Sequence, residues 1–351
     1  MTNVKQKKKM KPLTLLAVIL LAVVLFFGIV LGGVIGYFRL PVSKYYRASE
    51  KAFVIPALND DFVPQGFDFD REQNYFIFSG YQKDHSASPV FLTDKDGKLI
   101  KRVTLLNPDG SDYTGHGGGI AVGGNFLYVT GGEDCCLYVY SYLDFFDAKD
   151  GDKLTCLGKF STKISDTDYI ENAFVTVYDG KIITGEFYRA ESYPTLDSHK
   201  LTTKAGDYNQ ALAVEYMLDS TSPLGISSTP IKAYSLPDQV QGLTISDNKV
   251  YLSTSWGLSF SHIYEYDFAK LSLEGNFSVL GQNIPLYAMD SASLLNDYKI
   301  PPMSEEMVFV DGKLFIACES ASNKYIFGKF TGGQWMYATD LKKISKIINN
   351  I

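Results

Sequence analysis

The chain has 351 residues, which is enough for one large domain or two small ones, and 14% of them are aromatic. Aromatic residues favour β-strands, and the sequence lacks the long Ala/Leu/Glu/Lys stretches that are typical of helical proteins. The formal net charge is −6 and becomes −11 once the five lysines of residues 1–11 are set aside, so the bulk of the chain is acidic and is not expected to bind nucleic acid.

The N-terminal segment predicts a membrane anchor. Residues 12–37 contain no charged side chain, and about 20 apolar residues are enough to cross the hydrocarbon core as a helix. Because positive charge stays on the cytoplasmic side, we expect residues 1–11 to be a cytoplasmic basic tail, followed by a single-pass anchor in the cell membrane and an extracellular C-terminal domain. A cleaved signal peptide is the alternative, but its apolar region is shorter, about 7 to 15 residues, and ends at a small-residue cleavage site.

A similar pair of strands occurs five times between residues 51 and 342. Each copy opens with a polar residue, continues as an apolar strand, turns through a short segment that is often Asp-Gly-Lys or Asp-Asn-Lys, and returns as a second apolar strand. Asp-Gly between two strand-like runs is a strong hairpin signal, because type I′ turns need positive φ angles. The five copies open near Gln65, His116, Asn172, Gln241 and Glu305.

Two further strands follow each hairpin, so that each copy has the four strands of a propeller blade. In the fourth copy the last strand is expected at the less regular segment 284–289, and the fifth copy has only three strands before the chain ends. We expect the segment 51–58 to supply the missing strand and to close the ring without an open edge. The sequence therefore predicts an all-β fold, a five-bladed β-propeller over residues 51–342, with six blades as the alternative, a linker at 38–50 and a C-terminal tail at 343–351.

One mouth of the central channel is the predicted binding site. In a propeller, the innermost strand of each blade starts on the face to which the loop between the second and third strands returns. The candidate ligand-binding residues from these two positions are Gln65, His116, Asn172, Arg189, Gln241, Trp256, Glu305, Glu306 and Glu319. The polar segment 189–210 is expected as an insertion over the same mouth, either as a lid or as a solvated loop. The alternative for the whole ring is that these polar side chains tie neighbouring blades together.

The sequence carries no signature of nucleophilic catalysis, since both the G-x-S-x-G elbow and the H-E-x-x-H motif are missing. His116 and Glu305 are the candidates for acid–base chemistry, and a carboxylate pair such as Glu186 with Glu305 would suit a glycosidase. The four cysteines have no metal-binding spacing and are expected to be small buried residues.

Four strings carry a resemblance to a group of exported or membrane-anchored bacterial propeller proteins of unassigned function: VPQGF, YTGHGGGIAV, QGLTIS and, most specifically, PPMSEEMVFVDGKLFIACESASNKY. The resemblance covers most of residues 50–340. The chain is more loosely similar to the calcium-dependent lactonase and arylesterase propellers and to the strictosidine-synthase-like fold, which have six blades. Those families carry acidic and amide side chains around an axial metal, and the matching positions in this chain are Glu171, Asn172 and Glu305, so this resemblance implies a Ca²⁺ site at these three residues.

These patterns lead us to expect a membrane-anchored extracellular β-propeller that binds a cell-envelope ligand, a glycan or a protein, at the axial mouth. The alternative is a Ca²⁺-assisted extracellular hydrolase of the lactonase, esterase or glycosidase type, in which Glu305 or Glu171 holds the ion and His116 is the acid/base. A purely structural role in envelope assembly, through the blade edges and the anchor, is a third hypothesis.

Overall fold

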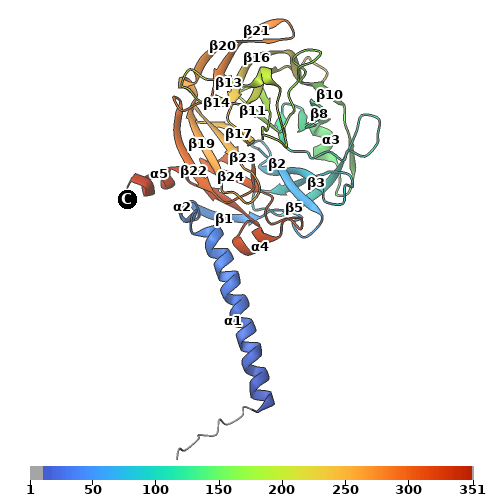
Figure 1. The fold of residues 1–351 in the computed structure, drawn as a ribbon. Coiled ribbons are helices and arrows are strands. Elements are labelled where there is room, and N and C mark those ends of the chain that lie inside the picture. The colour runs from blue at the N-terminus through green and yellow to red at the C-terminus, as the bar shows by residue number, and fades with distance from the viewer. Residues whose placement is uncertain (1–10, 350–351) are drawn as a thin grey trace, which may run out of the picture.

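The structure, a computed structural model that describes residues 11–349, is a five-bladed β-propeller preceded by a long helix (Figure 1). Each blade is an antiparallel sheet that runs from an innermost strand on the axis to an outer edge strand. In that order, blade 1 contains β2 (Phe62–Asp70), β3 (Tyr75–Gln82), β4 (Pro89–Asp94) and β5 (Leu99–Leu106). Blade 2 contains β6 (Ile120–Gly123), β7 (Phe126–Thr130), β8 (Cys136–Ser141) and β10 (Gly158–Ser161). Blade 3 contains β11 (Phe174–Tyr178), β12 (Lys181–Gly185), β15 (Ala211–Leu218) and β16 (Ile226–Leu236). Blade 4 contains β17 (Val240–Ser246), β18 (Lys249–Thr254), β19 (Ser261–Asp267) and β22 (Leu294–Ile300). Blade 5 contains β23 (Ser304–Val310), β24 (Lys313–Cys318), β25 (Trp335–Thr339) and β1 (Ser49–Val54).

The two ends of the propeller sequence meet in blade 5, as predicted. Strand β1 pairs antiparallel with β25, from Ser49 opposite Thr339 to Val54 opposite Trp335. The innermost strands form a closed ring, because β2 contacts β6 and β23, β11 contacts β6 and β17, and β17 contacts β23. The five-bladed prediction is confirmed.

The hairpin turns have the backbone that the sequence predicts. Both central residues have positive φ in the turns Asp179-Gly180 (49° and 70°), Asp247-Asn248 (50° and 57°) and Asp311-Gly312 (49° and 73°). Two positive φ angles define the type I′ turn, whose twist matches that of the flanking strands.

The outer strands depart from the expected order at two places. Strand β9 (Lys153–Thr155), which lies between β8 and β10 in the chain, pairs in parallel with β5 of blade 1. Strands β20 (Ser272–Val279) and β21 (Gln282–Ala288) follow β19, but β21 pairs in parallel with β16 of blade 3. The segment 284–289 is therefore not the last strand of blade 4, which is β22 instead. In both places an extra strand pairs with the preceding blade and joins the two blades by backbone hydrogen bonds. The pattern of apolar residues in one sequence does not show which blade such a strand joins.

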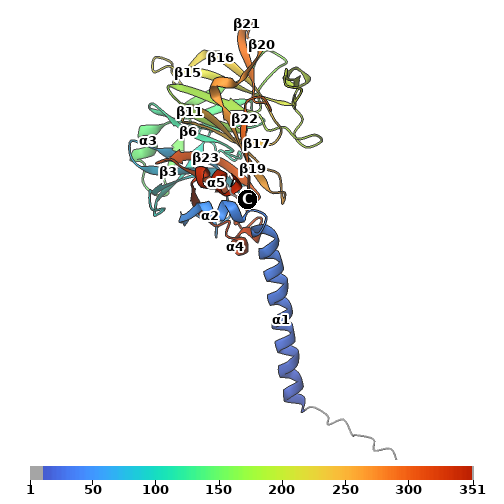
Figure 2. The same ribbon diagram turned by 90° about the vertical axis from the view of Figure 1, so that its left-hand side faces the viewer.

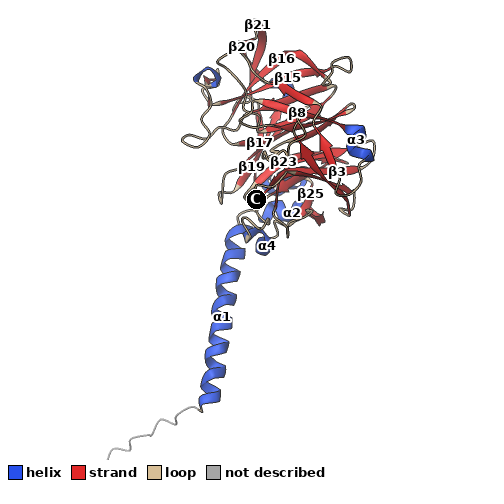
Figure 3. Cartoon of the chain, turned by 90° about the vertical axis from the view of Figure 1, so that its right-hand side faces the viewer, coloured by secondary structure: helices blue, strands red, loops and turns tan. Residues whose placement is uncertain are grey.

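Apolar packing holds the blades together. The five clusters of buried apolar residues each lie between two neighbouring blades, and the rings of Phe76 in β3 and Phe315 in β24, for example, have centroids 5.2 Å apart across the junction of blades 1 and 5. The strands are thus buried on both faces, so their sequences read as continuous apolar runs. Helices contribute little to this core (Figure 3).

Helix α1 (Pro12–Arg39) leaves the propeller at the edge of blade 5 (Figures 1 and 2). It is long and apolar enough to cross a membrane, and the hydrocarbon-length part of it packs against nothing in the chain. The segment 38–50 differs from the expected linker: it contains helix α2 (Ser43–Ala48), and the side chains of Val42 and Tyr45 are buried. The tail also differs, because helix α5 (Leu341–Asn349) packs against α2. The predicted basic tail lies almost entirely outside the described residues.

Four short helical segments and a small hairpin lie between the strands. These elements are α3 (Tyr142–Asp147), η1 (Asp197–His199), β13 (Leu201–Thr202), β14 (Tyr208–Asn209), η2 (Phe268–Lys270) and α4 (Phe327–Thr331). All four cysteines are free thiols within the described residues, and all except Cys135 are buried.

Candidate functional site

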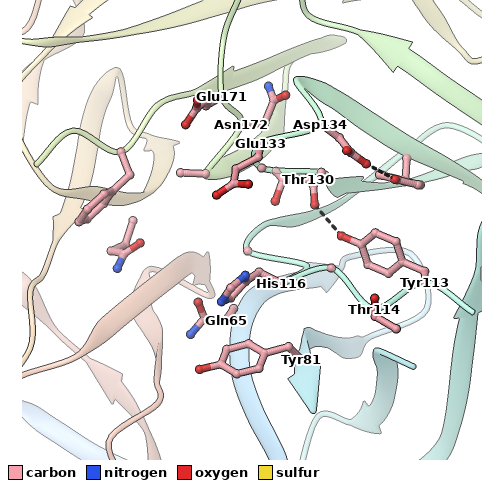
Figure 4. Close-up of a pocket in the computed structure, with 18 of the residues that line it drawn as sticks. Gln65, Tyr81, Tyr113, Thr114, His116, Thr130, Glu133, Asp134, Glu171 and Asn172 are labelled. Carbon is pink, nitrogen blue, oxygen red and sulfur yellow. Dashed lines mark hydrogen bonds between the residues drawn. The ribbon is translucent and has the colours of Figure 1, made fainter. Parts of the chain in front are cut away.

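A pocket of about 1200 Å³ occupies one mouth of the central channel and receives side chains from all five blades (Figure 4). Of the residues selected from the sequence, those that line it are Gln65, His116, Glu171, Asn172, Gln241, Trp256 and Glu319. Propeller topology brings these residues together although they span more than 250 positions of the chain, because each one begins an inner strand or follows a second strand.

Glu306 lies on the axis beneath the pocket rather than in its wall. Its Oε2 accepts hydrogen bonds from the backbone N–H groups of Phe67 and Ile120, and its Oε1 accepts one from Val175, all at 2.9 Å. The three donors belong to the inner strands of blades 1, 2 and 3, so one carboxyl group from blade 5 ties four blades together. Below it lies a second cavity of about 400 Å³, at the other end of the channel. Glu306 was predicted to bind a ligand, but its carboxyl group instead ties neighbouring blades together, which was the alternative for the ring of polar residues.

Two glycines leave room for this carboxyl group. A Cβ at Gly119 would lie 2.6 Å from Oε1 of Glu306, and one at Gly242 would lie 2.8 Å from its Cα. These positions face the crowded axis, where only a residue without a side chain allows the backbones to approach so closely.

A connected polar cluster forms the blade 5 side of the pocket. Gln65 donates to Oε2 of Glu319 at 2.8 Å, and Lys324 donates to the hydroxyl of Tyr81 at 2.5 Å. The ring of Tyr81 packs edge-on against His116, with centroids 4.5 Å apart. The enclosing pocket walls, and secondly the charge of Lys324, lower the pKa of His116, so this ring is neutral at physiological pH.

Glu305 is buried and does not line the pocket, but its carboxyl group interacts electrostatically with that of Glu319 at the pocket floor. Burial, followed by the charges of Glu319 and Glu306, raises the pKa of Glu305 well above its usual range. Burial raises the pKa of Glu319 to about 7, although Lys324 and the hydrogen bond from Gln65 oppose the increase. The floor therefore changes its charge near neutral pH.

Aromatic side chains form the opposite wall. Trp256 of blade 4 lies beside Phe187 and Tyr193 of blade 3, with ring centroids about 6 Å apart. Arg189 does not line the pocket; its guanidinium carbon lies 4.1 Å from the ring centre of Trp256. Tyr193 and Arg189 come from the segment 189–210, so this insertion does reach the mouth, as the sequence predicts.

A fully buried histidine fixes the insertion to blade 3. Nδ1 of His199 lies 2.9 Å from Glu186 and its Nε2 lies 2.6 Å from Asp168. Burial alone would lower the pKa of His199, but the hydrogen bonds and charges of Glu186 and Asp168 outweigh it and raise the pKa. Glu186 also accepts from the backbone N–H of Leu212, and it is therefore not available to form a catalytic pair with Glu305.

Replacing His199 by glutamine is expected to lower the free energy of unfolding by about 3 kcal/mol at pH 6, because it leaves the buried Glu186 and the partly buried Asp168 without their cationic partner. A histidine whose pKa is raised on folding stabilises the fold fully below pH 6.5, and this stabilisation is lost as the pH rises through the folded-state value. The difference between parent and variant in urea unfolding should therefore shrink towards pH 9.

The matched control is His262→Gln, because Nδ1 of His262 pairs at 2.6 Å with Asp297 in a partly exposed position. Such a pair contributes little, so we expect a change below about 1 kcal/mol. Equal losses in the two variants at pH 6 would contradict the role given to His199.

The residues proposed for Ca²⁺ do not form a preorganised ion site. Among residues 11–349, no group of three or more His, Cys, Asp or Glu side chains is placed to hold a metal. Both atoms of the Asn172 side-chain amide already form hydrogen bonds, since Oδ1 accepts from Thr162 at 2.8 Å and Nδ2 donates to Thr184 at 2.9 Å. The donor set of Glu171, Asn172 and Glu305 thus does not fit a hard cation that takes six to eight oxygens.

The pocket carries more negative than positive groups. Its acidic lining residues are Asp109, Glu133, Asp134, Glu171 and Glu319. Its basic ones are Lys159 and Lys324, and Lys159 is paired with Asp134 at 3.2 Å. Glu133 and Glu171 both appear in the upper part of Figure 4, across the pocket from His116. Burial, then the neighbouring Glu186 and Glu133, raises the pKa of Glu171.

Sequence reasoning missed part of the site. Asp109 belongs to the connection between blades 1 and 2, and Phe187 and Tyr193 were not selected although their neighbours Glu186 and Arg189 were. His116 lies four residues before β6, and the position that matches Gln65 next to the axis is Gly118 instead. The extra residues of the GHGGG string place the imidazole higher on the wall, where it meets Tyr81.

Comparison with known proteins leaves the fold class to be read from the chain itself. No protein-family model matches the sequence, and no curated protein sequence matches it. Among solved structures, the glutaminyl cyclase of Myxococcus xanthus is 13% identical, with a TM-score of 0.40 over 77% of this chain and 94% of that one. A putative 6-phosphogluconolactonase from Bacteroides fragilis is 11% identical, with a TM-score of 0.35 over 73% of this chain and 77% of that one. These values carry no argument about activity, so the class of this protein, a five-bladed β-propeller with an axial pocket, rests on the strand topology of the chain itself.

Proposed function

We propose that this protein is a membrane-anchored extracellular propeller that binds an amine-bearing glycan of the cell envelope in its axial pocket. The observation that carries the proposal is the combination of an acidic floor and rim with an aromatic wall in one large pocket. The ligand's ammonium groups would pair with carboxylates, and its sugar rings would stack on Trp256 and Tyr193.

The charge of the pocket supports a cationic ligand. Glu133, Glu171 and Glu319 have no lysine or arginine within salt-bridge distance among the described residues. Carboxylates grouped in a concave site strengthen each other's attraction for a cation, because the protein walls concentrate the field. Burial, and then the charges of Glu186 and Glu133, raise the pKa of Glu171, and an ammonium group that enters the pocket would offset those charges.

The shape of the pocket supports a chain-like ligand. A volume of about 1200 Å³ exceeds that of sites for single small molecules, which are typically about 300 to 1000 Å³. The Trp256 ring, held from one side by the Arg189 guanidinium, offers a rigid surface for stacking. Helix α1 and the acidic outer domain are in keeping with display outside the membrane, with the lysine-rich N-terminus inside.

Trp256→Ala is expected to weaken binding of a glucosamine tetrasaccharide about tenfold, because stacking on a rigid aromatic ring contributes about 1 to 2 kcal/mol. Isothermal titration of the full chain in detergent with this tetrasaccharide measures the effect. The fully N-acetylated tetrasaccharide, which has the same rings without the charges, should bind the parent protein more weakly.

The matched control is Trp335→Ala, since the chain has only two tryptophans and Trp335 lies in β25, away from the pocket. This variant should keep the parent's affinity. Failure of the parent to bind the charged tetrasaccharide, or no preference for it over the acetylated one, would refute the proposed ligand class.

A second candidate function is acid–base hydrolysis, favoured by the interacting carboxyl groups of Glu305 and Glu319 and by the neutral His116, which lines the same pocket as Glu319. Two carboxyl groups that share a site ionise at different pH values, as general acid–base chemistry requires. Turnover of a lactone or aryl ester by the parent protein that is lost in Glu305→Gln, with the fold retained, would establish this activity.

A further inference from the structure

The end of α1 is fixed against the propeller. The rings of Phe38 and Phe327 stack with centroids 4.9 Å apart, Nη1 of Arg39 donates to the carbonyl of Thr331 at 3.2 Å, and the Arg39 guanidinium lies 4.0 Å from the ring centre of Tyr46. These contacts join the helix to α4 and α2, so α1 is not a loose tether. The direction in which α1 leaves therefore sets how the propeller stands relative to a membrane that α1 crosses.

The surface around this junction is unusually apolar for a solvent-facing one. Four large side chains there are exposed: Tyr37 (65%), Leu40 (74%), Ile326 (50%) and Phe330 (54%). Ile326 has a φ of 63°, a conformation that is costly for a β-branched residue. The strained backbone of Ile326 is therefore not offset by burial of its side chain within the propeller, since half of that side chain stays exposed.

The helices around the junction are also basic, in contrast to the acidic domain. Helix α2 contains two lysines or arginines, α4 contains one and α5 contains three, while none of the three contains an Asp or Glu. All three lie at the end of the propeller from which α1 departs (Figures 1 and 2). Apolar side chains together with basic ones are the composition of a surface that lies in the headgroup region of an anionic bilayer.

We propose that this base surface, defined by Tyr37, Leu40, Ile326 and Phe330 with the basic helices α2, α4 and α5, rests on the bilayer that α1 crosses. Aromatic residues and arginine at the end of a membrane helix mark the interface, and Tyr37 and Arg39 occupy that position on α1. The four apolar side chains enter the headgroup boundary, and the basic helices face the anionic phosphates. The proposal rests on α1 crossing the membrane, as in the proposed function.

The consequence concerns access to the pocket. Lys324 and Tyr325 line the pocket and lead directly into Ile326 and α4, so one segment forms both the pocket rim and the base surface. Figure 1 views the ring of blades nearly along its axis with α1 running away from blade 5, so the propeller stands on its edge and the channel runs along the membrane. The pocket therefore opens beside the bilayer surface, within reach of ligands that are attached to it.

The test uses the full chain in nanodiscs of anionic phospholipid that carries a nitroxide near the top of the acyl chain. Phe330→Trp should give additional tryptophan emission that is quenched about twofold or more by the nitroxide lipid, relative to nanodiscs without it. The matched control is Leu273→Trp, because Leu273 is 50% exposed and belongs to β20, a strand that Figure 2 shows at the opposite end of the molecule from α1. Its additional emission should not be quenched.

Equal emission from Phe330→Trp with and without the nitroxide lipid would overturn the proposal. Incorporation of the chain into the nanodiscs reports separately on α1 as a membrane span, so failure of the anchor is distinguishable from failure of the base surface. Thermal melting checks that both variants fold. A version of the experiment in neutral lipid should reduce the quenching, because the basic helices then lose their electrostatic attraction.

Discussion

Glu306→Ala is expected to lower the free energy of unfolding by about 4 kcal/mol, the largest effect of any single substitution that we foresee in this protein. The substitution leaves three buried N–H groups of Phe67, Ile120 and Val175 without an acceptor and opens a cavity on the axis. Because those groups belong to three blades, the loss weakens the ring as a whole rather than one sheet. Urea unfolding followed by circular dichroism measures the change.

Glu305→Ala is the matched control, because Glu305 precedes Glu306 in the same strand and is equally buried. No backbone N–H of the described residues donates to its carboxyl group, and burial and neighbouring charges already disfavour its ionised form, which raises its pKa. We therefore expect Glu305→Ala to lower the free energy of unfolding by only about 1 to 2 kcal/mol, from the cavity alone, and this loss should decrease as the pH rises. A Glu306→Ala variant no less stable than Glu305→Ala would show that the axial carboxyl group does not hold the blades together.

Glu319→Gln is expected to change stability and binding in opposite directions. Burial raises the pKa of Glu319 to about 7, above the ordinary value of 4.5, so the folded state keeps a proton that the unfolded chain loses. A group of this kind makes the fold less stable as the pH rises from below 4.5 to above 7, by about 3 kcal/mol over the whole range. The glutamine variant lacks this dependence, so it should match the parent at about pH 4 and be more stable than the parent at about pH 8.

The same substitution should weaken binding of the glucosamine tetrasaccharide. The glucosamine amines also lose protons near neutral pH, so the two proteins are compared at each pH: the ratio of parent affinity to Glu319→Gln affinity should increase on the order of tenfold between about pH 5.5 and 7.5 as Glu319 ionises. Glu133→Gln serves as the control, since this carboxylate lies on the exposed rim of the pocket and not at its floor. If this ratio does not vary with pH, Glu319 does not contribute to ligand binding, even if its effect on stability is found.

The identity of the pocket residues was largely accessible from the repeat. Gln65, Asn172 and Gln241 lie at or near the starts of equivalent inner strands, and a ring of equivalent strands must bring these ends together. The chemistry of each residue was less accessible, because adjacent residues of a strand point to opposite sides. Glu305 and Glu306 are neighbours in the sequence, yet one interacts with the pocket residue Glu319 and the other accepts three backbone hydrogen bonds on the axis.

By itself, the sequence determined the propeller fold with five blades favoured over six, the turn type of the hairpins, the closure of the ring by the N-terminal strand and the presence of a membrane-length apolar helix. Each of these depends on a local pattern: apolar periodicity, Asp-Gly turns or an uncharged run. Only the tertiary structure decided that His199 joins Glu186 to Asp168, that β21 crosses to blade 3, that Asn172 is engaged by threonines, and that α1 is fixed beside the pocket rim. Those features are contacts between segments far apart in the chain, where many pairings satisfy the same local pattern and the packing of the whole molecule selects one.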